Sequence, residues 1–442
     1  FCFFGEVVCG GEIGMAREMK DSGYYWIGKI PINWQIRKVK DLYQIQTGFT
    51  PDTKREEYYA DEIEGYDWLT IGDLDGKMYI PHTTKNHISK LYVQKFSPSI
   101  IPKGSLLYSF KLSVGQVSIT NRDIYSNEAI ASFMPHSGVC LEFLYYSSSM
   151  IVENANENIY GAKILNQELI RNARVVCPPI EEQKKIALFL NKKCLELDNV
   201  LEKTRASIEE YKKLKQAVIT QAVTKGIRGN REMKDSQSTW FGQILSDWEM
   251  RKIKYIFKIQ KDIAGEDGPT VLSITQKGIK PKDLSKNEGQ LAENYSNYQL
   301  VHIGDFAMNH MDLLTGWVDV SKYEGVTSPD YRVFGLIDKD NYCSQYYLYL
   351  MQMCYTNRIF YGLGQGVSGL GRWRLQADKF LNFSITVPSY EEQKEIANYL
   401  DKKCSAIDEL IAKKEQYLSE IENYKKSLIY EYVTGKKEVP QE

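Results

Sequence analysis

Cysteine, proline and long apolar runs are scarce in this sequence, and each scarcity excludes a class of protein. Eight Cys in 442 residues, with no Cys-x-x-Cys pair, form neither a disulfide framework nor a zinc-ligand pattern, so a reducing cytoplasm is expected. Only 13 Pro accompany 43% apolar and 26% charged residues, which excludes a disordered chain. No apolar run reaches the roughly 18 residues of a membrane helix, so we expect a soluble, cytoplasmic protein without a membrane partner.

An excess of charge of one sign is also missing. The chain carries 56 basic and 57 acidic side chains, and its net charge is −1. Residues 36 to 160 hold 12 basic and 15 acidic groups, and residues 250 to 380 hold 16 and 14. No field of the whole chain therefore attracts nucleic acid or an anionic membrane, and any contact with DNA must be local.

Motifs for catalysis and cofactor binding are absent as well. The five His show no His-Glu-x-x-His spacing, so no metal site is predicted. Gly23 to Lys29 has most of a phosphate-loop spacing, but Ile30 stands where a Ser or Thr would hold Mg²⁺, which favours a turn. The Gly-rich segment Gly362 to Gly371 lacks the context of a dinucleotide site and is predicted to be a loop against a ligand. We expect no catalytic residue and no bound cofactor.

The chain repeats itself once. Arg17 to Lys40 aligns without gaps on Arg231 to Lys254, with 13 of 24 positions identical. Glu181 to Asp198 aligns on Glu391 to Asp408, with 11 of 18 identical. The 140 residues from 41 to 180 and the 136 residues from 255 to 390 show little mutual similarity. These blocks predict one scaffold that carries two different reading domains.

A heptad pattern follows Pro179 and Pro388, and it predicts two long helices. Apolar residues recur at spacings of three and four, and the second series repeats the first at an offset of 210 residues. A helix of roughly 40 residues extends about 60 Å, too long for an ordinary surface helix, so each copy is expected to pair with the other. Gly226 and Gly435 mark the predicted ends. The predicted seam comprises Leu197, Leu201 and Ile208 in the first helix and Ile407, Ile411 and Leu418 in the second.

The fold class predicted from these patterns is α+β, because both interiors mix strand-like and helical runs. We expect two pseudo-repeated globular domains separated by the two long helices. Phe1 to Gly14, before a start at Met15, are expected to be an extension of doubtful origin. The predicted segments are this extension at 1–14, domains at 15–178 and 229–388, and helices at 179–228 and 389–437.

The order of the repeated motifs resembles that of a known family. Each half opens with Lys-Asp-Ser-x-x-x-Trp-x-Gly and continues through a variable interior to a Pro-x-x-Glu-Glu-Gln helix. This order, from Met15 or Met19 to about Lys437, resembles the specificity (S) subunit of a type I restriction and modification system. The resemblance implies two target recognition domains, each reading one half of an asymmetric split target in double-stranded DNA, on an antiparallel coiled coil that sets the spacer.

The resemblance also implies partners. Two methylation (M) subunits with S-adenosylmethionine, and motor-nuclease (R) subunits with ATP and Mg²⁺, would do the chemistry, and this chain would not be an enzyme. Because the Glu-Glu-Gln helix starts are duplicated, two copies of one partner are expected there. The predicted partner surface comprises Glu181, Glu182, Gln183, Glu391, Glu392 and Gln393.

Polar residues in loop-like segments are the candidates for contacts with DNA, because base edges and phosphates are read by Arg, Lys, Asn, Gln and hydroxyl groups. The first domain offers Gln46, Thr47, Lys111, Gln116, Lys163 and Gln167, and the second offers Gln276, Lys277, Asn309, Arg372 and Arg374.

Two other functions remain open. A scaffold that docks partners without reading DNA would explain the helices, but not two different interiors on one framework. A fused endonuclease and methyltransferase would need catalytic motifs that the chain lacks.

Overall fold

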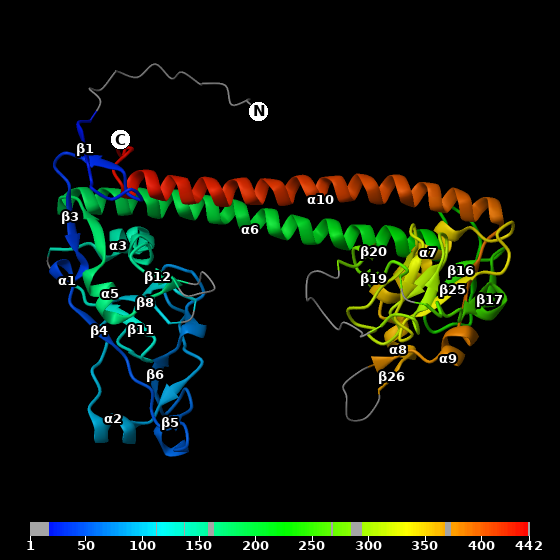
Figure 1. Ribbon diagram of the computed structural model, residues 1–442, viewed down its shortest axis with the longest axis horizontal. Helices are drawn as coiled ribbons and strands as arrows, with labels where there is room; N and C mark the ends of the chain where they lie inside the picture. Colours follow the sequence, from blue (N-terminus) through cyan, green and yellow to red (C-terminus); the bar gives the residue numbers. More distant parts are fainter. Residues whose placement is uncertain are drawn as a thin grey trace. The chain divides into compact units, whose positions relative to one another are not determined.

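The computed structural model (Figure 1) describes residues 17–111, 113–136, 138–157, 163–266, 268–283, 294–366 and 373–440. The predicted extension at Phe1 to Gly14 lies outside these ranges. Two compact units divide the chain: the first comprises Phe1–Lys203 and Leu418–Glu442, and the second comprises Thr204–Tyr417. Within the described ranges, no helix is long and apolar enough to cross a membrane.

Two long helices are present where the heptad pattern predicts them. The helix α6 (Ile180–Lys225) has 46 residues and α10 (Tyr390–Val433) has 44 (Figure 1). Gly226 directly follows α6 and Gly435 follows α10 after Thr434, and both glycines are in the left-handed conformation, with φ of 70° and 71°. A residue with a Cβ is strained at such an angle, so glycine is the usual helix stop. Both predicted helices and both stops are confirmed.

The two helices pair in antiparallel fashion in each unit. In the first unit, Lys425 Nζ lies 2.6 Å from an Asp198 carboxylate oxygen. In the second, Lys215 Nζ lies 2.6 Å from Asp408. Within each unit, a residue nearer the end of one helix meets a residue nearer the start of the other. The two ion pairs occupy equivalent places in the repeat, because Lys425 and Asp408 follow Lys215 and Asp198 by the same offset of 210 residues.

The six residues predicted for the seam between the helices are buried or half-buried. Aromatic contacts support the pairing: the rings of Phe189 and Tyr432 lie 4.5 Å apart, and Lys414 Nζ lies 5.7 Å from the Tyr211 ring. Among the six predicted seam residues, three are buried and three are half-buried; the buried ones are Leu201, Ile208 and Ile407, and the others are Leu197, Ile411 and Leu418.

The first domain contains two four-stranded sheets. One has the order β4 (Ile45–Thr47), β11 (Ile130–Phe133), β8 (Leu106–Ser109), β9 (Val117–Ile119). The other has the order β10 (Tyr125–Ser126), β6 (Tyr66–Leu69), β7 (His87–Ile88), β5 (Tyr59–Ala60). The paired strands outside these sheets are β1 (Met19–Asp21) with β2 (Lys29–Pro31), β3 (Gln35–Lys38) with β14 (Arg174–Cys177), and β12 (Asn156–Glu157) with β13 (Lys163–Ile164). The short helices are α1 (Val39–Leu42), α2 (Lys90–Phe96), α3 (Leu141–Ser147), α4 (Ser149–Val152) and α5 (Gln167–Asn172), with 3-10 turns η1 (Glu56–Tyr58) and η2 (Ile71–Asp73).

In its described residues the second domain contains one four-stranded sheet, in the order β18 (Phe257–Gln260), β25 (Arg332–Leu336), β22 (Phe306–Met308), β23 (Val318–Val320). Three strand pairs repeat those of the first domain: β15 (Met233–Asp235) with β16 (Gln243–Leu245), β17 (Glu249–Lys252) with β28 (Ser384–Val387), and β26 (Gln365–Gly366) with β27 (Trp373–Arg374). Two further pairs are β19 (Leu272–Thr275) with β20 (Gly278–Pro281), and β21 (Gln299–Val301) with β24 (Gly325–Thr327). The short helices are α7 (Ser344–Thr356), α8 (Ile359–Leu363) and α9 (Ala377–Asn382), with the 3-10 turn η3 (Ile253–Tyr255).

The interiors share a sheet although their sequences differ. In chain order, β4, β8, β9 and β11 correspond to β18, β22, β23 and β25, and both sheets have the same order of strands. The domains differ outside this sheet, where the first has a second four-stranded sheet and the second has separate strand pairs. The α+β prediction is confirmed for both, and the repeat extends further than sequence identity shows.

Each domain encloses the end of one long helix. The core of the first domain includes Trp34 together with Leu428 and Val433 of α10. The core of the second includes Trp248 together with Val223 of α6. Both tryptophans are almost fully buried. Burial of large aromatic and aliphatic side chains is the main stabilising term at such a junction, so each helix end is fixed to its domain.

Candidate nucleic-acid interface

The repeated tryptophans and glutamates form one contact, present in both halves. Glu182 accepts a hydrogen bond from the Trp34 indole at 2.8 Å and pairs with Arg17 at 2.6 Å. The second half repeats this arrangement with Glu392, Trp248 and Arg231. In both halves, a hydrogen bond and an ion pair thus connect the helix that starts with Glu-Glu-Gln to the repeated N-terminal block of its own half.

The glutamines of the same motif are also used internally. Gln183 accepts the Cys140 backbone N–H at 3.2 Å and donates to the Pro178 carbonyl at 2.8 Å. Gln393 repeats these contacts with Cys343 and Pro388 at 2.8 and 3.0 Å.

These contacts reduce the number of predicted partner-surface residues that are exposed. Gln183, Glu392 and Gln393 are buried and Glu182 is half-buried, because each satisfies polar groups of its own domain. Glu181 and Glu391 keep 74% and 75% of their side chains exposed, and among the described residues each forms an ion pair with the lysine three residues later. Of the six predicted residues, these two remain available to a partner.

Three of the first domain's candidates lie together where β4 ends and α5 begins. Gln167 Nε2 donates to Thr47 Oγ1 at 2.8 Å, and Gln46 Nε2 donates to the Ile100 carbonyl at 3.1 Å. Arg171, on the next turn of α5, donates to the Ile45 carbonyl at 3.2 Å. Amide, hydroxyl and guanidinium groups therefore lie along one edge of the sheet. The sequence predicts these residues in separate loops and does not indicate that they lie close together.

The other candidates of the first domain are set apart from this edge. Lys111 lies 3.5 Å from Glu128, and Lys163 lies 3.5 Å from Glu157 and 3.7 Å from Glu153. Both lysines are partly exposed, and such ion pairs stabilise a fold by about 1 kcal/mol or less, so DNA phosphates can replace the carboxylates at small cost. Gln116 is half-buried in the loop between β8 and β9, where its backbone N–H donates to Ser109 Oγ at 3.1 Å.

The second domain's candidates have different surroundings. Gln276 Nε2 donates to the Thr315 carbonyl at 3.2 Å, and the residue lines a cleft of about 870 Å³ together with residues of α6 and α10. Lys277 is exposed in the turn between β19 and β20. Asn309 Oδ1 accepts the backbone N–H groups of Met311 and Asp312, both at 3.2 Å, so this oxygen shapes the loop. Arg372 lies outside the described residues.

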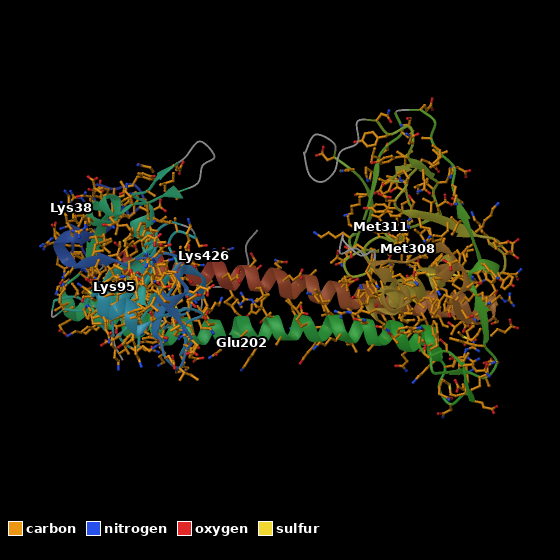
Figure 2. The ribbon with its side chains drawn as sticks, turned by 90° about the horizontal axis from the view of Figure 1, so that it is seen from below. Lys38, Lys95, Glu202, Met308, Met311 and Lys426 are labelled. Atoms are coloured by element: carbon orange, nitrogen blue, oxygen red, sulfur yellow. The ribbon has the colours of Figure 1, made fainter. Side chains whose placement is uncertain are left out.

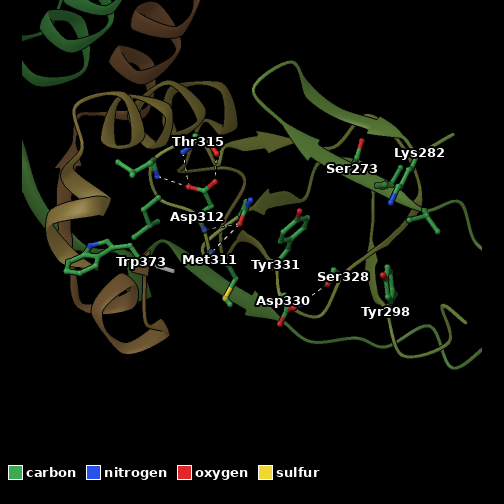
Figure 3. Close-up of a pocket in the computed structure, with 15 residues that line it drawn as sticks. Ser273, Lys282, Tyr298, Met311, Asp312, Thr315, Ser328, Asp330, Tyr331 and Trp373 are labelled. Atoms are coloured by element: carbon green, nitrogen blue, oxygen red, sulfur yellow. Dashed lines mark hydrogen bonds between the residues drawn. The ribbon is translucent and has the colours of Figure 1, made fainter. Parts of the chain in front are cut away.

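A cleft of about 730 Å³ opens beside this loop (Figure 3). Its walls include the rings of Tyr298, Tyr331 and Trp373 and the carboxylates of Asp312 and Asp330. Asp312 accepts hydrogen bonds from the backbone N–H groups of Leu314 and Thr315, drawn as dashed lines in Figure 3. Aromatic faces with carboxylate acceptors suit a base that offers an exocyclic amine. No pattern in the sequence indicates this cleft.

A basic cluster is buried in the same domain. Arg332 and His310 are each 5% exposed, and Arg374 is half-buried. Burial, with the nearby Arg332 and Arg374 charges, lowers the pKa of His310 to about 3, so the imidazole is neutral at pH 7. Burial lowers the pKa of Arg332 to about 10, which still leaves it charged. Arg374 was a predicted DNA contact, whereas Arg332 was missed although it is the one charge in the apolar run Arg332–Leu336.

Comparison with known proteins gives a consistent family. Residues 31–210 and 245–423 match the model of the type I restriction modification DNA specificity domain. The MjaVIII specificity subunit of a type I restriction enzyme from Methanocaldococcus jannaschii is 24% identical over 430 residues, which cover 92% of this chain and 94% of that protein. The MjaIX specificity subunit from the same organism is 31% identical over 170 residues, which cover 37% of this chain and 39% of that protein.

One solved structure shares the fold. A chain from a study of complex assembly and conformational transition of the type I R-M system matches with a TM-score of 0.66. The two chains are 12% identical, and the match covers 91% of this chain and 98% of the other.

Proposed function

Because this chain belongs to the family of type I restriction-modification DNA specificity domains, we propose that it selects the DNA target of such a system, each domain reading one half of an asymmetric bipartite sequence. One observation carries this proposal. The two domains share a sheet with one strand order and one helix-start contact, yet they differ in the residues and strands around that sheet. A shared framework with different surfaces suits two readers of different sequences.

The chemistry on DNA is assigned to partners. We propose that methylation subunits with S-adenosylmethionine and motor-nuclease subunits with ATP and Mg²⁺ act where this chain binds, and that the chain itself binds no cofactor. Family membership and the lack of catalytic motifs in the sequence support this division.

Two equivalent exposed surfaces support recruitment of two copies of one methylation subunit. Glu181 and Glu391 are exposed at equivalent helix starts. Along the helices, Val200 and Leu214 of α6 are 38% and 49% exposed, and the residues at the equivalent positions of α10, Leu410 and Tyr424, are 42% and 57% exposed. Exposed apolar residues at heptad spacing on a helix outside its seam are typical of a surface for further helices.

Native mass measurement tests the recruitment. Replacing Leu214 and Leu410 by Asp should reduce the number of bound methylation subunits while each helix stays folded, because both residues are exposed. The control replaces the exposed Glu202 of α6, labelled in Figure 2, by Gln. Unchanged stoichiometry in the double variant would contradict the surface.

Mapping of methylated sites tests the reading of DNA. Cells carrying this chain and its methylation partner should show one bipartite, asymmetric motif. Replacing residues 41–176 by the same region of a relative should change one half of that motif and leave the other, because each domain has its own core. A palindromic or undivided motif, or a change in both halves, would contradict the proposal.

A scaffold that docks partners without reading DNA is the alternative. It predicts that binding to duplex DNA is independent of sequence. Competition between the mapped target and a scrambled duplex, at one fixed salt concentration, separates the two functions.

A further inference from the structure

The second recognition domain contains a buried group of basic side chains that come from three separate segments. Arg332 is the first residue of β25, Arg374 is the last residue of β27, and His310 follows β22 by two residues. The side chains of Arg332 and His310 are nine-tenths or more buried, whereas Arg374 is half-buried and is the member that solvent reaches.

Two hydrogen bonds and one cation–π contact hold the three segments together. Arg332 Nη2 donates to the Leu375 carbonyl at 2.9 Å, and its guanidinium lies 4.9 Å from the ring centre of Phe380. The Leu375 backbone N–H donates to the His310 carbonyl at 3.0 Å. The cluster is therefore fixed by one strand, one loop and one hairpin.

Three nitrogen atoms of this cluster are enclosed without a hydrogen-bond partner among the described residues: Nη1 of Arg332, Nε of Arg374 and Nδ1 of His310. None of the ion pairs between described residues includes either arginine, and the titratable groups that act on Arg332 are the Tyr355 hydroxyl, whose pKa burial raises so that it stays neutral, and the Arg374 guanidinium. Two guanidinium groups thus lie close together without a carboxylate from the described part of the chain. A buried charge without a partner of opposite charge destabilises a fold, because the lost hydration of the charge is not compensated.

The fold itself does not require a charge at this place. In the second domain Arg332 pairs with Met308 across strands β25 and β22. In the first domain Leu106 pairs with Phe133 as Phe306 pairs with Phe334, and two residues further along β8 Tyr108 pairs with Ala131, so Ala131 is the equivalent of Arg332. Ala131 is almost fully buried. A position that accepts alanine in one domain and an unpaired arginine in the other indicates that the arginine serves a ligand.

We propose that Arg332, Arg374 and His310 form an oxyanion site that binds a phosphate group. Guanidinium groups present parallel N–H donors in the fork that matches phosphate oxygens, and two of them compensate the charge of a phosphodiester or an inorganic phosphate. His310 Nδ1 offers a third donor in the tautomer that protonates this nitrogen.

The neighbouring cleft indicates where the phosphate belongs. In the chain, Met308 precedes His310 and Met311 follows it; both methionines are labelled in Figure 2, and Met308 is fully buried, whereas Met311 lines the cleft. Tyr331 and Trp373, the residues before Arg332 and Arg374, also line it. The same three segments therefore supply the cleft and the basic cluster. A phosphate of the DNA backbone bound here would fix the register of a base in the cleft, and this source rests on the proposed function.

Thermal unfolding of the full chain in inorganic phosphate, against chloride at equal ionic strength, tests the site. The wild-type midpoint should rise with phosphate and reach a plateau, by about 3 °C or more. Arg332→Met and Arg374→Met should lose this rise. Lys339→Gln, which removes an exposed charge from the turn after β25, should keep it. Without phosphate, Arg332→Met should unfold at or above the wild-type temperature, because an uncompensated charge is gone.

Binding to duplex DNA across a salt series identifies the source of the phosphate. Loss of one backbone contact lowers the dependence of log K on log salt by about one unit. If Arg332→Met shows this decrease and Lys339→Gln does not, the phosphate belongs to DNA, with or without a response to free phosphate. If only free phosphate responds, the site takes a small phosphate ligand. If neither measurement responds, the site is overturned, while sequence-dependent DNA binding by the wild type would leave the proposed function intact.

Discussion

At the scale of single residues, Glu391 and Glu392 are neighbours in the chain but have different surroundings. Glu392 accepts the Trp248 indole N–H at 3.0 Å and pairs with Arg231, whereas Glu391 pairs with Lys394 on the surface. Glu392→Gln should lower the free energy of unfolding by about 1.5–3 kcal/mol, because hydrogen bonds to a charged, buried acceptor are strong. Thermal unfolding of the full chain measures the difference.

Glu391→Gln is the matched control, with an expected change below about 0.5 kcal/mol. Equal effects of the two substitutions would show that the contact with Trp248 does not stabilise the second half.

His310 gives a second prediction at this scale, in the pH dependence of stability. Its pKa is about 3 in the folded chain, because it is buried beside Arg332 and Arg374, against 6.5 in the unfolded chain. Between these values the unfolded chain binds the extra proton. The contribution of neutral His310 to the stability of the folded chain is therefore complete above pH 6.5 and is lost as the pH falls toward 3.

Unfolding midpoints of wild type and His310→Gln between pH 7 and pH 4 test this. As the pH falls, the free energy of unfolding of the wild type should decrease by up to about 1.4 kcal/mol per pH unit more than that of the variant. Parallel curves for the two proteins would mean that His310 does not titrate between its folded and unfolded states in this way.

The sequence identified part of the candidate site. Spacing and residue type indicated Gln46, Thr47 and Gln167 as polar loop residues, but their meeting depends on how β4 and α5 pack, which no local pattern encodes. The Glu-Glu-Gln motif was predicted as a partner surface because repetition alone does not distinguish exposed from buried polar groups. Gln183 and Gln393 are buried because they satisfy backbone groups far along the chain.

At the scale of elements, Lys215 and Lys425, which pair with Asp408 and Asp198 of the other helix, determine the register of the helix pair. A lysine at a seam position can extend its charged end to the helix surface, where each meets an aspartate of the other helix. Lys215→Glu should lower stability by about 1 kcal/mol, since it places two carboxylates together, and the added Asp408→Lys should restore most of the loss.

A double-mutant cycle in thermal unfolding measures this coupling. We expect a coupling free energy of about 0.5–1 kcal/mol between Lys215 and Asp408, because Asp408 is 56% exposed and water weakens the ion pair. The same cycle at Lys425 and Asp198 should give the same sign. Strictly additive effects at both pairs would contradict a role of these lysines in the register.

Elements with a strong period were predictable from the sequence, and sheets were not. The heptads, prolines and terminal glycines gave both long helices and their ends, because these signals are local. The shared strand order of the two interiors was not predicted, since it depends on pairing between distant segments such as β4 and β11. Alternation of apolar residues identifies a strand but not its neighbour.

At the scale of the whole molecule, α6 is the covalent connection between the last strand of the first domain, β14, and the first strand of the second, β15. A helix has a fixed rise per residue, so the length of the helix pair is expected to set the spacer between the two half-sites. One heptad added after Leu201, and one at the facing place after Ile421, keeps the seam and lengthens the pair by about 10 Å.

The spacer of the target should then grow by about one to three base pairs, because DNA rises about 3.4 Å per base pair and the rod can tilt across the duplex axis. Both half-site sequences should stay the same, since neither domain is altered. Sequencing of methylated sites in cells with the lengthened chain measures this directly. A single heptad in α6 alone is the control, because it shifts Lys215 and Asp408 out of register and should reduce assembly. If the doubly lengthened chain assembles, methylates and keeps its original spacer, the distance between half-sites is set by something other than the helices.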